Sequence, residues 1–436
     1  MNSEKNTRDL PYYEKLGFDN FESWSANDIE QFLIFDFLDI NTKIGQKEVK
    51  ETAYSDWQFS NHKYNKHKLV VDFFDRFFLE LCRKEKKNNN PKILFQGLKY
   101  RYIVSGIKKK CNLSLIAQNG KDRLFALANS LGYISTNKLF FYVCEYLNDK
   151  NVQHLHKMLK ELENDLISVR PDYIVLSGDF TPIQRAIVLV SKRLGIPTLE
   201  IQHGIYNSYH PLVTGIVADY VLVWGKYFKD LYLDKGCKTA EKVYILGYPY
   251  QTKKKETISR KKGKHIVCYL GTDFERYDKK LLGVKLNTVR GLLKICEGAG
   301  FEFIYRPHPH EDTSFLRESM PNLKISNKKE KLEEAFEKAD IFISFNSTAL
   351  IQASMAGKIC FQLMDFPVYV DNFESLGICD KSFKTIERLE DHFKSLANKP
   401  NVNRFKAEFN SDYINTKHNP VEHFLDIIDK IERKTR

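Results

Sequence analysis

The 436-residue sequence contains no apolar run long enough to cross a membrane. A membrane-spanning helix needs roughly 18 apolar residues in succession, whereas the longest apolar strings here, such as 220–224, have the length of single buried strands. The first residues, MNSEKNTRDLPYYEKLGF, also lack the apolar centre of a secretory signal. From these two absences we expect a cytoplasmic protein.

Closely spaced cysteines and paired acidic motifs are missing as well. The eight cysteines are scattered without any Cys-x-x-Cys spacing, and Cys268 and Cys360 fall within apolar, strand-like runs. This pattern predicts reduced core cysteines and argues against a disulfide framework or a zinc site. No Asp-x-Asp sequence stands at the end of a predicted strand, so we expect no bound metal ion.

Acidic residues are too few to balance the basic ones: 56 against 68, for a formal charge of +12. Basic clusters occur at 83–87, 108–110, 253–255 and 260–264. The simplest interpretation is a solvated, lysine-rich surface, and the alternatives are attraction to anionic lipid at the inner membrane face or to an anionic glycan or nucleotide. No recognition helix or aromatic–basic module accompanies the charge, so no nucleic-acid partner is expected.

What the sequence does contain is an alternation of short apolar strands and amphipathic helices. Strands are predicted at 92–95, 113–117, 173–177, 198–202, 220–224, 243–246, 265–270, 302–305, 341–345 and 359–363. Helices are predicted at 183–194, 281–297, 331–339 and 349–356, and before residue 173, where leucines recur with helical spacing at Leu155, Leu159, Leu162 and Leu166. This alternation is typical of a parallel sheet covered on both faces.

The alternation restarts after a basic, turn-rich segment, which predicts two α/β domains. We expect two doubly wound, Rossmann-like domains at 91–252 and 264–418 that face each other across a cleft, followed by a C-terminal helix at 419–436. Residues 1–90 form a predicted, mostly helical extension, in which aromatic and aliphatic residues would line one helix face: Phe73, Phe74, Phe77, Phe78 and Leu81. In the helix 281–297 the predicted buried stripe is Leu282, Leu286, Val289, Leu293 and Cys296.

A stiff, basic loop follows the second strand of the second predicted domain. Ligands of open α/β sheets bind at the carboxyl ends of the strands, and there the sequence places Tyr-Arg-Pro-His-Pro-His at 305–310. Its prolines restrict the backbone of a loop that carries Arg306 and His308. A guanidinium or imidazole N–H held in this way can bind a phosphate or stabilise a departing one. The alternative is a stiffened loop with incidental histidines; we favour the ligand loop.

A hydroxyl-rich segment opens the helix predicted at 349–356. Asn346, Ser347 and Thr348 follow a strand directly. Backbone N–H groups and hydroxyls at a helix N-terminus can hold an anion. Plain capping of the helix by the same side chains is an equally common use, but the segment shares its domain with the His308 loop, which favours the anion site.

Three more polar positions follow predicted strands. Gly271, Thr272 and Asp273 end the first strand of the second domain, where the glycine would let a phosphate approach the backbone. In the first domain, Asp179 and His203 each lie beside a glycine at the end of an apolar strand, and either could act as a general base on a hydroxyl. The alternatives are a turn or capping carboxylate for Asp179 and a buried, hydrogen-bonded imidazole for His203.

The order of these motifs resembles that of bacterial GT-B-fold glycosyltransferases. The matching segments are QHG (202–204), ADYVLVWG (218–225), GYP (247–249), RPHP (306–309) and SFNSTALIQASMAGK (344–358). The resemblance is to enzymes of capsule and lipopolysaccharide biosynthesis, including Kdo and sialic-acid transferases, and to teichoic-acid polymerases that use CDP-glycerol. It covers about residues 170–365.

The resemblance implies a metal-independent transferase that needs no cofactor, because the nucleotide sugar is its substrate. The implied donor-binding residues are Gly271, Thr272, Asp273, Arg306, His308, Asn346, Ser347, Thr348 and Gln352. Within this set His308 would contact the donor phosphate, which Ser347 and Thr348 would hold from the helix N-terminus. Many relatives have a glutamate where Gln352 stands, contacting the ribose or sugar. Asp179 or His203 would be the base in the acceptor-side domain.

The implied partners are a nucleotide-sugar donor and a glycan or lipid-linked acceptor. CMP-sugars are the first expectation for the donor, and UDP- and GDP-sugars are the alternatives. Two other functions remain open: a nucleotide-sugar 2-epimerase, which shares the two-domain build, and a non-catalytic partner of a membrane glycan-assembly complex. The basic clusters add an anionic inner-membrane surface as a candidate peripheral partner.

Overall fold

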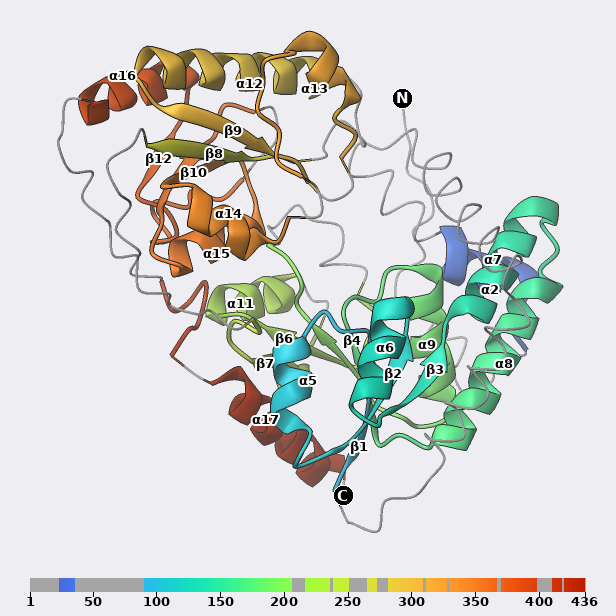
Figure 1. Ribbon diagram of the computed structural model, residues 1–436. Coiled ribbons are helices and arrows are strands. Elements are labelled where there is room, and N and C mark those ends of the chain that lie inside the picture. Colours follow the sequence, from blue (N-terminus) through green and yellow to red (C-terminus); the bar gives the residue numbers. More distant parts are fainter. Residues whose placement is uncertain are drawn as a thin grey trace. The chain divides into compact units, whose positions relative to one another are not determined.

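The chain folds into two compact units. A computed structural model describes residues 23–35, 90–205, 216–235, 238–250, 265–272, 281–308, 311–327, 330–366, 370–397, 410–417 and 419–435. The first unit comprises Met1–Tyr250 and Asn415–Arg436, and the second comprises Gln251–Ile414 (Figure 1). No helix in these described ranges is long and apolar enough to span a bilayer. Of the predicted N-terminal extension the structure describes α2 (Ala26–Glu30) and η2 (Gln31–Phe35); the helix predicted around 73–81 lies outside the described residues.

The first unit is built on a parallel sheet in the order β3-β2-β1-β4-β5-β6-β7. Its strands are β1 (Lys92–Gln96), β2 (Asn112–Ala117), β3 (Gly132–Ser135), β4 (Tyr173–Leu176), β5 (Thr198–Ile201), β6 (Tyr220–Val223) and β7 (Val243–Ile245). Its helices are α5 (Arg101–Ile107), α6 (Gly120–Ala128), α7 (Asn137–Asp149), α8 (Gln153–Val169), α9 (Pro182–Arg193), α11 (Lys226–Asp234), the turn η3 (Ala240–Lys242) and α17 (Pro420–Thr435). All the predicted strands are confirmed, and β3 is additional.

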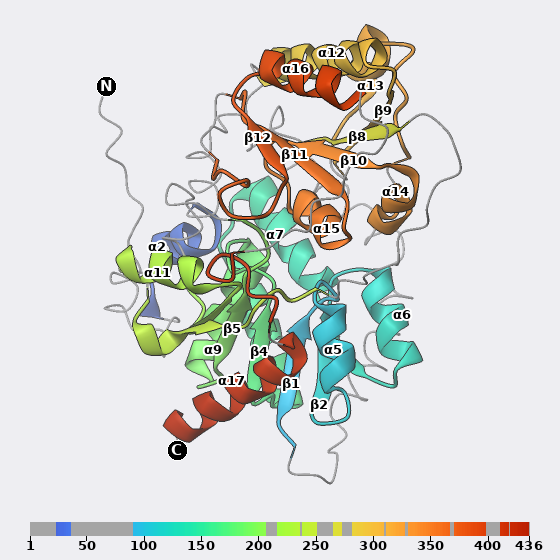
Figure 2. The same cartoon turned by 90° about the vertical axis from the view of Figure 1, so that its left-hand side faces the viewer.

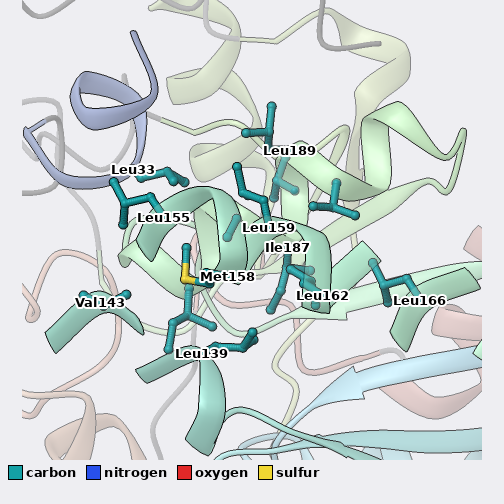
Figure 3. Close-up of a cluster of buried hydrophobic side chains, with 14 of the residues drawn as sticks. Leu33, Leu139, Val143, Leu155, Met158, Leu159, Leu162, Leu166, Ile187 and Leu189 are labelled. Carbon is teal, nitrogen blue, oxygen red and sulfur yellow. The ribbon is translucent and has the colours of Figure 1, made fainter. Parts of the chain in front are cut away.

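Helices cover both faces of this sheet. Successive strand side chains point to opposite faces, so Ile93 and Phe95 of β1 pack with α5, α6 and α17, while Leu94 packs with α7, α8 and α9 (Figure 2). The leucine stripe predicted before residue 173 is confirmed in α8, where it is fully buried against side chains of α7, α9 and η2 (Figure 3). Burial on both faces explains why the strands read as short, continuous apolar runs.

The C-terminal helix α17 packs on the first unit, although it follows the second unit in sequence. A Cβ on Gly106 of α5 would lie 2.6 Å from Cγ2 of Val421, so the missing side chain allows α5 and α17 to approach closely. The ring of Phe424 lies 5.6 Å from that of Phe95 on β1. The C-terminal helix predicted at 419–436 corresponds to α17, and its buried apolar face completes the core of the first unit.

The second unit contains a parallel sheet in the order β12-β11-β10-β8-β9. Its strands are β8 (Ile266–Leu270), β9 (Glu302–Arg306), β10 (Ile341–Ser344), β11 (Ile359–Leu363) and β12 (Lys381–Phe383). Its helices are α12 (Leu281–Gly298), α13 (Ser314–Ser319), α14 (Leu332–Lys338), α15 (Thr348–Met355) and α16 (Ile386–Ala397). The chain therefore consists of two Rossmann-like α/β domains, as the alternation predicted.

The cysteines in the described ranges are core residues. Cys111, Cys144, Cys268, Cys296, Cys360 and Cys379 are all free and buried, as their sequence context predicted. Burial raises the pKa of the Cys111 and Cys144 thiols to about 11, so both stay neutral at physiological pH. Neutral, buried thiols are poor nucleophiles, which leaves these two side chains a packing role.

Candidate functional site

Three loops of the second unit leave the same edge of its sheet. β8 lies between β9 and β10, Leu270 is the register partner of Arg306, and the Ser344 hydroxyl donates to the Leu270 carbonyl at 3.2 Å. The segments that follow these strands therefore begin side by side. They carry the predicted residues Gly271 and Thr272, Pro307 and His308, and Asn346, Ser347 and Thr348; Asp273 lies outside the described residues.

The hydroxyl-rich segment does cap a helix. Ser347 is the N-cap residue of α15, and its Oγ accepts the N–H of Ala349 at 3.2 Å. The Oδ1 atom of Asn346 is buried and has no hydrogen-bond partner among the described residues. A buried, unsatisfied side-chain amide is costly, and a ligand at this helix N-terminus could satisfy either its oxygen or, after rotation of the amide, its NH₂ group. Capping by Ser347 and anion binding at Asn346 and Thr348 are thus compatible.

A buried ion pair that sequence reasoning missed holds the His308 loop. Nζ of Lys285 on α12 lies 2.7 Å from Oε1 of Glu311, with side-chain exposures of only 3% and 0%. The Tyr305 hydroxyl donates to the same carboxylate at 2.5 Å, and the backbone N–H of His308 donates to Glu311 Oε2 at 2.9 Å. Burial raises the pKa of Glu311, while Lys285 and the two hydrogen bonds oppose that shift. The carboxylate therefore fixes the main chain of His308.

The same lysine ties the Gly271 loop to the His308 loop. Lys285 Nζ also donates to the carbonyl of Thr272. A Cβ on Gly271 would lie 2.3 Å from the Tyr305 hydroxyl and 2.8 Å from Glu311 Oε2, so no larger residue fits while that network is intact. The sequence suggested that Gly271 leaves room for a phosphate; the structure shows that it leaves room for Tyr305 and Glu311.

Arg306 lies apart from this network. Side chains alternate along a strand, so Arg306 and Tyr305 lie on opposite faces of the sheet. The guanidinium donates from Nη2 to the carbonyl of Glu330 at 3.1 Å, and its buried Nε has no hydrogen-bond partner within the described part of the chain. Gln352 lies half-buried on the second turn of α15. The structure thus groups His308 and Thr272 with the α15 N-terminus, and sets Arg306 against the segment before α14.

A cavity of about 530 Å³ lies beside β9 and α14. No predicted site residue lines it. Its wall combines apolar and charged side chains: Cys268, Ile304, Lys324, Ile325, Ser326, Asn327, Glu330, Glu334, Ala335, Lys338 and Ala339. Cys268 and Ile304 belong to the middle of β8 and β9, so this cavity extends away from the carboxyl ends of the strands.

In the first unit, Asp179 anchors the backbone. Its Oδ2 accepts the N–H groups of Val217 at 2.5 Å and Ala218 at 2.7 Å, and its side chain is 3% exposed. The carboxyl of Glu200 on β5 is buried close to Asp179; burial, followed by the charge of Asp179 and hydrogen bonding to it, raises the pKa of Glu200 well above the ordinary value. Asp179 is thus occupied by two backbone N–H groups, which favours its structural interpretation, whereas the buried Oε2 of Glu200 has no hydrogen-bond partner among the described residues.

His203 is the more accessible of the two predicted bases. It follows β5, is half-buried, and its ring lies 5.7 Å from that of Phe180. The preceding Gln202 is completely buried: its Oε1 accepts the N–H of Trp224 at 2.9 Å and its Nε2 donates to the carbonyl of Gly204 at 2.8 Å. These bonds fix the turn that presents the imidazole at the carboxyl end of the sheet.

Solved structures share this two-domain fold. No family model and no curated protein sequence matches the chain. A Methanocaldococcus jannaschii UDP-GlcNAc 2-epimerase in complex with UDP-GlcNAc and UDP aligns over 78% of this chain and 99% of its own, with 19% identity and a TM-score of 0.51. A putative UDP-N-acetylglucosamine 2-epimerase from Listeria monocytogenes aligns over 80% and 98%, with 12% identity and a TM-score of 0.56. The chain has the GT-B fold. Identities this low support that fold alone.

The buried carboxyl pair of this GT-B chain should make its stability depend on pH. Because the pKa of Glu200 is raised in the folded state, its contribution is complete below the unfolded value of 4.5 and is lost as pH rises through the folded value. A Glu200→Gln variant keeps a donor for Asp179 but cannot ionise. We expect it to match the wild type near pH 5 and to exceed its stability increasingly toward pH 8, by at most about 1.4 kcal/mol per pH unit.

Urea denaturation of both proteins across this pH range measures the difference. Substituting the exposed Glu318 on α13 by glutamine is the control and should leave the pH profile unchanged. A constant difference between wild type and Glu200→Gln at all pH values would show that Glu200 is already ionised in the folded protein.

Proposed function

We propose that this GT-B chain is an enzyme acting on a nucleotide-activated sugar, and that its second unit holds the donor phosphate. The observation that carries the proposal is the meeting of the His308 loop, the Thr272 loop and the α15 N-terminus at one edge of the sheet. Helix N–H groups, hydroxyls and an imidazole are suited to a phosphate that gains charge as the sugar departs. Complexes of structural neighbours with UDP-GlcNAc and UDP support a uridine nucleotide, beside the CMP-sugar that the sequence suggested.

Sugar transfer is the reaction that we favour. An oxocarbenium-like transition state requires stabilisation of the departing phosphate and a base for the incoming hydroxyl. In the proposed reaction His308, Thr348 and the α15 backbone carry out the first task, and His203 removes the proton of a glycan or lipid-linked acceptor. One accessible base suffices for this chemistry.

A nucleotide-sugar 2-epimerase is the second candidate, favoured by the UDP-GlcNAc 2-epimerase neighbours. Inverting a carbon centre requires acid and base groups that reach the sugar. At the carboxyl ends of β4 and β5 the candidate groups are the half-buried His203 together with Asp179, bound by two backbone N–H groups, Glu200, which is buried, and the neutral Gln202. Of these groups His203 is the accessible one, and a single accessible base suits transfer, so we favour transfer over epimerisation.

Nucleotide binding is the first test of the proposal. A thermal-shift series with CMP, CDP, UDP and GDP should show one base whose nucleotide raises the melting temperature, because a ligand at about 100 times its Kd adds about 2.7 kcal/mol to the stability of the folded protein. The corresponding nucleoside lacks the phosphate and should give a much smaller shift. Equal, negligible shifts with all four nucleotides would remove the donor site from the proposal.

The reaction itself separates the two enzymes. The nucleotide sugar whose base gives the largest shift is incubated with the protein, with and without a glycan acceptor, and followed by NMR. A transferase releases the nucleotide in an acceptor-dependent manner, whereas an epimerase converts the nucleotide sugar to its C2 epimer without an acceptor. Binding without either product would identify the non-catalytic alternative.

A further inference from the structure

Two leucines on α6 are exposed to an unusual degree. Leu124 and Leu127 have relative exposures of 67% and 55%; the remaining strongly exposed large apolar side chain among the described residues is Ile167 on α8, at 48%. Positions three apart lie on one face of a helix, so the two leucines form a common apolar surface. Placing such a surface in water is unfavourable, and adjoining apolar patches often mark an interaction site.

The surroundings of these leucines carry positive charge. Between residues 90 and 135 the chain has eight lysines and arginines and a single acidic residue, Asp122. The carboxyl of Asp122 is turned inward: it is 3% exposed and its Oδ2 accepts the N–H of Gln118 at 2.9 Å. The exposed charges of this region are therefore all basic, and they include Lys121 on α6 itself and the run 108–110 after α5.

The two helices present these side chains on one surface. α5 and α6 lie side by side on the same face of the first unit's sheet (Figures 1 and 2). Lys108 Nζ donates to the Asn129 side chain at 3.1 Å, which joins the ends of the two helices. The Arg101 guanidinium lies 5.1 Å from the centre of the Phe125 ring. Lysines therefore flank Leu124 and Leu127.

We propose that this α5–α6 surface docks the protein on an anionic lipid bilayer. Leucines can enter the acyl boundary while lysines around them meet the lipid phosphates, a combination that matches a membrane interface. A nucleic acid would attract the lysines but offers no apolar phase for the leucines. The proposal is independent of the reaction proposed above, because it rests on the exposed groups of α5 and α6.

Vesicle co-sedimentation of the full chain tests this docking. We expect binding to phosphatidylcholine vesicles that contain phosphatidylglycerol and little binding to vesicles of phosphatidylcholine alone. The double variant Leu124→Gln/Leu127→Gln should weaken binding about tenfold or more, since two apolar side chains no longer enter the bilayer. The triple variant Lys108→Gln/Lys109→Gln/Lys110→Gln should weaken it about a hundredfold at low salt, and added salt should reduce wild-type binding.

Ile167→Gln is the matched control, because it removes an exposed apolar side chain from the opposite face of the same sheet. It should bind as the wild type does. All the substituted side chains are exposed, so the melting temperatures should stay unchanged, which separates docking from folding. Wild-type affinity in the leucine variant, an equal loss in the Ile167 control, or equal binding to neutral and anionic vesicles would each overturn the proposal.

Discussion

Replacing Lys285 by methionine should lower the free energy of unfolding of the second unit by about 3–5 kcal/mol. The substitution leaves the Glu311 carboxylate, which is completely buried, without its cation. It also removes the hydrogen bond to the Thr272 carbonyl, so the loops after β8 and β9 lose a common anchor. Methionine fills about the same volume as the lysine side chain. The expected loss of stability therefore comes from the unpaired carboxylate and not from a cavity.

The double variant Lys285→Met/Glu311→Gln is the decisive control. It removes both charges together, and replacing a buried ion pair by neutral groups is often close to neutral for stability. The sequence of the second unit, 251–414, contains no tryptophan, so tryptophan fluorescence cannot report this change. Hydrogen exchange of the β8 and β9 amides can. Equal exchange in the single and double variants would show that the unpaired carboxylate carries no cost.

The ion pair also shows what the sequence could not indicate. Hydrophobic periodicity predicted α12 correctly, but the predicted stripe is only partly buried: Val289 and Cys296 lie in the core, whereas Leu282, Leu286 and Leu293 are half-buried. N-terminal to Val289, the buried residue of α12 is Lys285. A pattern of apolar residues cannot reveal a buried charge whose partner comes from a loop 26 residues further along the chain. The one local sign of this buried charge is the spacing of Lys285, which lies four residues before Val289 and therefore on the same helix face.

The strands with continuous apolar runs could be predicted from the sequence, but two edge strands could not. The strands predicted from continuous apolar runs are present with boundaries shifted by at most one residue. The two that were missed, β3 (Gly132–Ser135) and β12 (Lys381–Phe383), are the outermost strands of their sheets. β12 is short and half-covered, and so lacks the apolar run that marks a central strand.

The sequence predicted those features of the site that depend on residues within a single loop. The capping role of Ser347 and the strand–loop junction at His308 follow from residues adjacent in sequence. The role of Asp179 does not, because its partners are the N–H groups of Val217 and Ala218, which are 38 and 39 positions away. Only these long-range backbone contacts distinguish Asp179, which anchors the backbone, from the accessible His203.

Replacing His308 by alanine should lower kcat about 10²–10³-fold while leaving the protein folded. The half-buried His308 lies two residues after the end of β9, and Glu311 holds its main chain through an N–H that alanine retains. The loop should therefore keep its position, and the loss should be confined to what the ring does to the departing phosphate. Affinity for the nucleotide should fall, whereas affinity for the nucleoside, which lacks the phosphate, should not change.

His156→Ala provides the matched control, since this histidine is also half-buried but lies on α8 of the first unit. Titration calorimetry of the wild type and both variants with the nucleotide and its nucleoside, together with the turnover assay, then gives six affinities and three rates. If His308→Ala weakens nucleotide and nucleoside equally, the ring acts on the base or on the loop. If turnover is unchanged, the phosphate is stabilised by the α15 N-terminus and Thr348 without the imidazole, and the His308 loop serves only to position Tyr305 and Glu311 behind it.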